Sequence, residues 1–173
     1  MILACKLSIA LADFGLAHQM PSLDPAAVEK LPASALAGNG PRRFIPPEAL
    51  SGGFGAKVVT CSYYSSDVYV LGGFMFEVLS GGREPWHWLS EMQMRQLEFL
   101  PAEQRKHLLD DPKAMACIEA GCRGRRELKA QLVDLVRDCL ALNPSDRPTI
   151  HTVLERVSMM MMCEDGAVSD AVQ

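Results

Sequence analysis

The hydrophobic pattern of the chain predicts a buried helix at residues 66–80. Apolar side chains recur there every three or four positions, as they do along one face of a helix: Val68, Leu71, Met75, Val78 and Leu79. Phe74 and Phe76 widen this face, so we expect the helix to be buried nearly all round. Gly81 and Gly82 follow, and glycine is the residue that most commonly ends a helix.

Further helices are predicted on the C-terminal side. Residues 126–142 are strongly amphipathic, with one apolar face made by Leu128, Leu132, Leu135, Val136, Cys139 and Leu140. A last helix is expected after Pro148, with Ile150, Val153, Leu154 and Val157 facing inward. Residues 88–121 predict two or three short helices. We expect residues 159–162 to be a flexible apolar end and residues 163–173 to be a disordered tail.

The N-terminal part of the chain has weaker patterns. Residues 5–12 alternate loosely between apolar and polar positions, which predicts a short strand. Six of the eleven prolines lie within residues 21–47, where they break regular structure. A short helix is possible at residues 25–31, because Asp24 can cap it. Residues 51–64, which contain several glycines, predict a connecting loop.

Composition narrows the class of protein without defining it. The 173 residues are 49% hydrophobic and 22% charged, which is typical of one globular domain. The net charge of -4 favours neither nucleic acid nor an anionic membrane as a partner. The six cysteines form no C-x-x-C pair, and no run reaches the ~18 apolar residues of a membrane span. We therefore expect a soluble, cytoplasmic protein with reduced cysteines.

Four short motifs occur in a defined order. They are Asp13-Phe14-Gly15, Pro46-Pro47-Glu48-Ala49-Leu50, Ser66-Asp67-Val68-Tyr69 and Asn143-Pro144-Ser145-Asp146-Arg147-Pro148-Thr149. Their order and spacing resemble the C-terminal part of a protein kinase domain, from the D-F-G motif onward. The resemblance implies a mainly α fold over residues 1–162. It would be a partial kinase-like C-lobe, with an activation segment and a helical bundle around helix 66–80.

The resemblance also implies roles for individual residues. Asp13 matches the D-F-G aspartate, which in the family binds the Mg²⁺ that bridges ATP phosphates. Phe14 would pack against the core, and Gly15 would give the backbone freedom for the turn. Asp67 matches an aspartate that accepts hydrogen bonds from the backbone of the catalytic loop.

A second implied feature is an ion pair between Glu48 and Arg147. In the family the glutamate of the A-P-E motif pairs with such an arginine and ties the end of the activation segment to the base of the lobe. Arginine suits a planar, bidentate pair with a carboxylate. The expected role is structural, and the sequence assigns no catalytic or nucleotide-binding residue.

The segment at residues 41–50 indicates which branch of the family is resembled. A proline, a basic residue and an aromatic residue precede Pro46-Pro47-Glu48, as in tyrosine kinases and tyrosine-kinase-like kinases. Typical Ser/Thr kinases carry a threonine where Pro41 stands, and Pro46 replaces the usual alanine. Specificity for Ser/Thr or Tyr stays open.

Several kinase motifs have no counterpart in this sequence. A working kinase needs a Gly-rich loop, a strand lysine, its glutamate partner and H-R-D-x-x-x-x-N, all of which precede D-F-G. Only twelve residues precede Asp13, and none is His, Arg, Asp, Asn or Glu. We therefore expect the chain alone neither to phosphorylate proteins nor to bind MgATP tightly, so its status as an enzyme is open.

Three interpretations remain for the whole chain. It is a kinase sequence cut short, whose full form acts on a protein substrate, or a non-catalytic, pseudokinase-like module that binds a partner protein. The third is an unrelated helical interaction domain. In the family, the helix that packs beside helix 66–80 lies upstream of D-F-G. The first two interpretations therefore predict an exposed apolar strip, unless further chain covers it.

Overall fold

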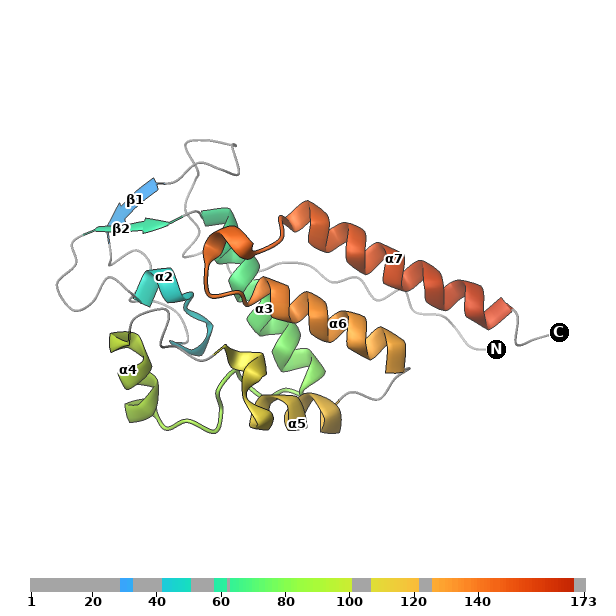
Figure 1. Ribbon diagram of the computed structural model, residues 1–173, viewed down its shortest axis with the longest axis horizontal. Coiled ribbons are helices and arrows are strands. Elements are labelled where there is room, and N and C mark those ends of the chain that lie inside the picture. The colour runs from blue at the N-terminus through green and yellow to red at the C-terminus, as the bar shows by residue number, and fades with distance from the viewer. Residues whose placement is uncertain are drawn as a thin grey trace, which may run out of the picture.

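The structure is a computed structural model that describes residues 29–32, 42–50, 58–61, 63–100, 107–121 and 126–169. Most of these residues are helical, so the predicted mainly α fold is confirmed (Figure 1). The elements in chain order are β1 (Glu29–Pro32), η1 (Arg42–Phe44), α2 (Pro47–Leu50), β2 (Val58–Cys61), α3 (Tyr63–Leu79), α4 (Glu91–Phe99), η3 (Leu108–Asp110), α5 (Pro112–Gly121), α6 (Arg126–Cys139), η4 (Pro144–Asp146) and α7 (Ile150–Ser169).

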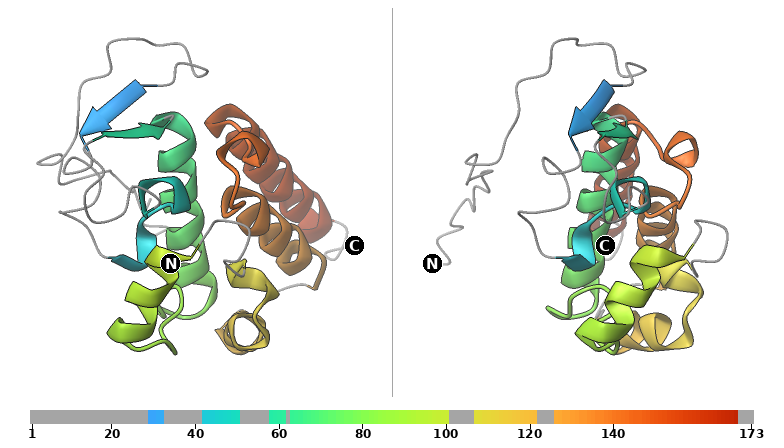
Figure 2. Two further views of the ribbon diagram at one scale, coloured as in Figure 1. Left: turned by 60° about the vertical axis from the view of Figure 1, so that its left-hand side comes forward. Right: turned by 90° about the vertical axis from the view of Figure 1, so that its left-hand side faces the viewer.

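The strands β1 and β2 form a small antiparallel sheet beside the N-terminal end of α3 (Figure 2). Glu29 pairs with Cys61, and Pro32 pairs with Val58. The sequence prediction was wrong for residues 29–31, assigned to a short helix, and for residues 58–61, assigned to a loop. The β-branched run of β2 favours a strand. Its pairing with β1 is a long-range contact that a local capping signal does not reveal.

Helix α3 is the central element, and it packs closely along α6. It begins at Tyr63, three residues before the predicted start. Gly72 permits the close approach, because a Cβ atom there would lie 2.8 Å from Cys139 Cβ and 3.0 Å from Leu140 Cγ. Around this contact lies a core of fully or nearly fully buried side chains: Tyr69, Phe76, Leu108, Leu109, Ala114, Ile118, Val133, Val136 and Leu140.

One face of α3 is exposed, which corrects the prediction that this helix is buried nearly all round. Val70, Phe74 and Val78 are 42%, 57% and 62% exposed. They recur every four residues and therefore line one side of the helix, opposite Gly72 and α6. We call these three residues the α3 strip. Phe74 does not widen the buried face, because more than half of its surface is exposed.

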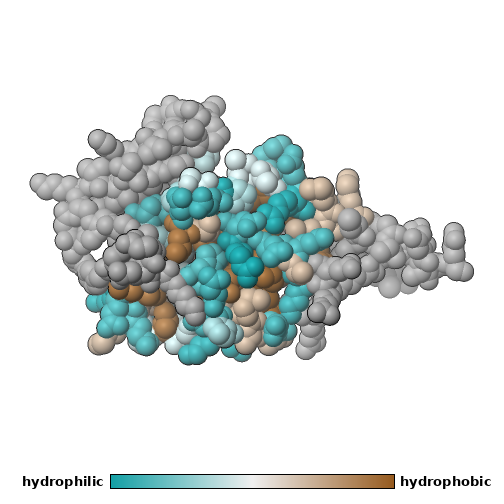
Figure 3. All heavy atoms as spheres, in the orientation of Figure 1, coloured by the Kyte–Doolittle hydropathy of each residue, from teal (hydrophilic) through white to brown (hydrophobic). Residues whose placement is uncertain are grey.

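Helices α6 and α7 complete the C-terminal side. A second core cluster joins them to α3 through Val68, Leu135, Cys139, Val153 and Met160. The predicted amphipathic helix is confirmed, although α6 ends at Cys139. The face with α6 in front is mainly hydrophilic over the described residues, with apolar side chains between the hydrophilic ones (Figure 3).

Helix α7 differs from its predicted form in two respects. Ile150 and Leu154, expected to face inward, are exposed, whereas Val153 and Met160 are buried. The helix also runs to Ser169, through residues expected to be a flexible end and the start of a disordered tail. Apolar residues stand on both sides of α7, so the sequence alone does not identify the side that packs.

Candidate functional site

The motif residues Glu48 and Arg147 come together at the base of the helical lobe. Arg147 Nη1 lies 2.7 Å from Glu48 Oε1, and Nη2 lies 2.8 Å from Oε2, so the pair is bidentate. The Arg147 side chain is fully buried and the Glu48 side chain is 11% exposed. Ser66 Oγ donates a further hydrogen bond to Glu48 Oε1, at 2.9 Å.

Backbone carbonyl oxygens accept hydrogen bonds from the remaining N–H groups of the Arg147 guanidinium. Its Nε donates to Ala141 O at 2.8 Å, Nη1 to Ser65 O at 3.0 Å and Nη2 to Leu142 O at 3.4 Å. With the two bonds to Glu48, all five N–H groups of the guanidinium have acceptors. The Tyr69 ring lies against the same cation, with Cζ 4.8 Å from its centroid. The pair therefore holds α2 to the start of α3 and to the turn after α6.

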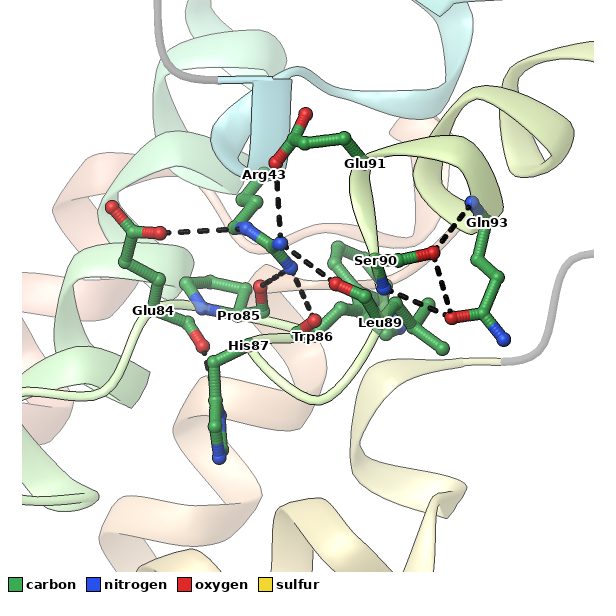
Figure 4. A network of polar contacts seen from close by, with 9 residues as sticks. All are labelled: Arg43, Glu84, Pro85, Trp86, His87, Leu89, Ser90, Glu91 and Gln93. Carbon is green, nitrogen blue, oxygen red and sulfur yellow. Dashed lines mark hydrogen bonds and ion pairs between the residues drawn. The ribbon is translucent and has the colours of Figure 1, made fainter.

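A second polar network holds the segment that precedes α2, and the sequence motifs did not predict it. The Arg43 guanidinium points into the loop between α3 and α4 (Figure 4). It donates to the carbonyl oxygens of Trp86, Leu89 (2.8 Å) and Pro85 (3.5 Å). Its Nε lies 3.4 Å from Glu84 Oε2, and Nη2 lies 3.3 Å from Glu91 Oε1.

Two local features accompany the contact between Arg43 and this loop. Trp86 has a positive φ of 50°, an uncommon backbone conformation for a residue other than glycine. Phe44, the next residue after Arg43, packs on α3 at Gly73, where a Cβ atom would be 2.8 Å from Phe44 Cδ1. The basic–aromatic pair Arg43-Phe44 was the available sequence signal for this network, but only the folded loop shows the acceptors of Arg43.

Asp67 lies at the start of α3, on the same side as the α3 strip. It precedes Val70 by three residues and Phe74 by seven, which places all three on one helix face. Partial burial raises the pKa of Asp67 above its usual value, although the residue is exposed. No hydrogen bond to its carboxylate occurs within the described part of the chain. Its implied role toward a catalytic loop therefore stays a prediction.

The D-F-G motif, Asp13-Phe14-Gly15, lies outside the described residues, so the implied Mg²⁺ ligand Asp13 also stays a prediction. Within the described ranges, no three His, Cys, Asp or Glu side chains lie close enough together to hold a metal ion. Nor does any helix in those ranges have the length and apolar character to cross a membrane.

The described residues form a mainly helical lobe, in which the buried Arg147 binds Glu48 of the Pro46-Pro47-Glu48 motif. The resemblance to a kinase C-lobe implied this arrangement. The family described as protein tyrosine and serine/threonine kinase has a model that matches residues 1–157. The chain therefore belongs to the protein kinase family. No curated protein and no solved structure matches it.

Proposed function

We propose that the chain forms the C-lobe of a protein kinase that transfers phosphate from ATP to hydroxyl groups of a protein substrate. Family membership supports the reaction class. The observation that carries the proposal is the buried, bidentate Glu48–Arg147 pair, which fixes the point where an activation segment would end. In such a kinase, Mg²⁺ would neutralise the charge that develops on the transferred phosphate. Asp13 is the residue of this chain that would hold it.

We propose further that the chain by itself is inactive. Phosphoryl transfer depends on positioning and electrostatic stabilisation, and the sequence has no H-R-D-x-x-x-x-N motif to supply the base and second metal ligand. The purified chain should incorporate no phosphate from ATP into a generic protein substrate, and MgATP should not raise its melting temperature. A saturable thermal shift, or phosphate incorporation, that disappears in Asp13→Asn would contradict this.

A second candidate function is that of a non-catalytic module that binds an apolar segment of a partner protein. The specific observation in its favour is the α3 strip, whose three apolar side chains are exposed on the central helix. If the chain is such a module, it should unfold cooperatively as a monomer at micromolar concentration. A chain that aggregates, and becomes soluble only when joined to further kinase sequence, would favour the first candidate.

The branch of the kinase family and the cellular location are proposed mainly from the sequence. We infer a tyrosine-kinase-like member, because Pro41 stands where typical Ser/Thr kinases carry threonine and Arg43-Phe44 follows it. Phosphorylation of a tyrosine or serine peptide by the catalytically complete protein would decide the substrate class. A cytoplasmic location agrees with the free thiols of Cys117 and Cys139.

A further inference from the structure

Three side chains with complementary chemistry meet where the loop after α3 contacts α5. Cys117 Sγ lies 3.7 Å from His87 Nε2 and 3.9 Å from Arg83 Nη1. Arg83 Nη1 also lies 3.5 Å from His87 Nε2. Arg83 and His87 come from the loop and Cys117 from the middle of α5, so the fold, and not local sequence, brings the thiol to its neighbours. We call these three residues the Cys117 cluster.

The orientation of His87 makes it a base toward the thiol. Its Nδ1 lies 3.2 Å from Glu84 O, and a carbonyl oxygen can only accept a hydrogen bond. We therefore assign the proton of the neutral ring to Nδ1, which leaves the single lone pair of Nε2 facing both Cys117 Sγ and Arg83 Nη1. The Trp88 ring packs edge-on against the imidazole, with the centroids 5.0 Å apart. In Figure 4, His87 points away from Arg43, on the other side of the loop.

Arg83 supplies a positive charge beside the sulfur. A guanidinium at this distance can donate to the sulfur once His87 has taken the thiol proton, and the thiolate is the nucleophilic form of the side chain. Arg83 is exposed and His87 is half-buried, so the cluster lies at the surface. Cys117 itself is only 9% exposed, which limits its reaction partners to small molecules.

Cys139 provides a contrast within the same molecule. It is fully buried between α3 and α6, and burial raises the pKa of its thiol to about 11. A buried thiol that stays protonated at neutral pH is chemically inert. The two cysteines therefore differ in environment, and Cys139 is an internal reference for the reactivity of Cys117.

We propose that Cys117 is a peroxide-reactive thiol, with His87 as its base and Arg83 as the partner of its thiolate. Hydrogen peroxide is a small, uncharged oxidant that suits the limited exposure of the sulfur. An S–O bond forms as the O–O bond breaks, and the thiol becomes a sulfenic acid while the peroxide is reduced to water. The thiol proton passes through His87 Nε2 to the leaving hydroxide, so the products are the sulfenic acid and one water molecule.

The site of this oxidation adjoins the loop that holds Arg43. Glu84 and Trp86 contact the Arg43 guanidinium from the same stretch that carries Arg83 and His87. A sulfenic acid at Cys117 replaces the S–H donor that faces His87 with a larger polar group. The oxidised sulfur would therefore lie close to the contact between residues 42–44 and the α3–α4 loop.

The proposal can be tested by treating the full chain with hydrogen peroxide and trapping sulfenic acid with dimedone. Mass spectrometry then gives a labelling rate for each cysteine. We expect Cys117 to label at least ~10-fold faster than Cys139, and faster in the folded chain than in the same chain in concentrated urea. Burial alone would slow the folded chain, so a faster rate in the folded state requires an activated thiol.

Substitutions of His87 and of Arg83 test the contribution of each neighbour to the reactivity of Cys117. His87→Asn and Arg83→Gln should each slow labelling of Cys117 severalfold, whereas Arg83→Lys should keep most of the rate. Cys117→Ser removes the signal, and His151→Asn, on the exposed side of α7, should change nothing. Labelling of Cys117 in the folded wild-type chain that is no faster than in urea would overturn the proposal, even if the variants failed to fold.

Discussion

Arg147 is the residue on which the base of the lobe depends. All five N–H groups of its buried guanidinium are bound, two of them by Glu48. Glu48→Ala leaves this cation without its counter-charge, so we expect a loss of ~3–5 kcal/mol in the free energy of unfolding, measured by urea denaturation. Asp134→Ala, which removes an exposed i,i+3 partner of Arg137, should cost less than about 0.5 kcal/mol. A similarly small loss for Glu48→Ala would refute the structural role.

His107 should make stability depend on pH. Burial lowers the pKa of its imidazole below the usual 6.5, and the nearby Asp110 carboxylate offsets this only in part. Its Nδ1 accepts from Leu109 N at 3.2 Å, and among the described residues no acceptor lies within hydrogen-bonding geometry of the buried Nε2. The folded state thus favours the neutral ring. As the pH falls below 6.5, the unfolded chain binds the proton first, and the folded state loses stability.

The test compares melting temperatures between about pH 8 and about pH 5, on either side of the ordinary histidine pKa. His107→Asn keeps a side-chain acceptor for Leu109 N but cannot titrate, so the part of the pH dependence that belongs to His107 should disappear. His151→Asn replaces an exposed histidine and should leave that dependence in place. An identical pH profile for wild type and His107→Asn would show that the folded state does not disfavour the charged ring.

The contact between α3 and α6 depends on the absence of a side chain at Gly72. Alanine there would gain helix propensity, by up to ~1 kcal/mol. Its Cβ, however, would lie 2.8 Å from Cys139 Cβ and 3.0 Å from Leu140 Cγ, closer than packed carbons tolerate. We expect Gly72→Ala to lower the free energy of unfolding by ~1–3 kcal/mol in urea denaturation. A stabilised variant would mean that the two helices separate easily.

The Arg43 network belongs to the connection between η1 and the α3–α4 loop. Arg43→Ala removes every hydrogen bond from this guanidinium to the carbonyls of Trp86 and Leu89. Amide hydrogen exchange should therefore rise in residues 83–90 and stay unchanged in the centre of α6. Glu91→Gln, which changes only an exposed partner, should have little effect. Equal exchange in Arg43→Ala and wild type would show that the loop holds its shape without the arginine.

Sequence patterns predicted some elements better than others. The 3.6-residue period of α3 and α6 was sufficient to place both helices, because their packed faces are long and apolar. The same period was misleading at Ile150 and Phe74, since a periodic apolar position does not say whether a neighbour covers it. The sheet was missed because β1 and β2 lie far apart in the chain and pair only once it has folded. The Glu48–Arg147 pair was predicted from its two motifs. The Arg43 network was not, because Arg43 binds mainly backbone carbonyl oxygens, which carry no sequence signal.

At the scale of the whole molecule, the α3 strip should control association. Val70, Phe74 and Val78 are exposed apolar side chains on one face of the central helix. We expect Phe74→Asp to reduce self-association in sedimentation velocity, with a small effect on stability because the side chain is already exposed. Met92→Asp, an exposed methionine on α4, is the matched control and should not reduce association. Equal association of Phe74→Asp and wild type would exclude the strip as the contact.

The 99-residue separation of Glu48 and Arg147 has a consequence for biosynthesis. At ordinary translation speeds, Glu48 leaves the ribosome roughly 5–20 s before Arg147 does. During that interval its carboxylate lacks the Arg147 counter-charge, and the segment from residue 42 to α2 lacks this attachment to the base of the lobe. The base of the lobe can therefore close only after η4 and Arg147 have been synthesised, and a nascent chain that stalls before η4 cannot form this ion pair.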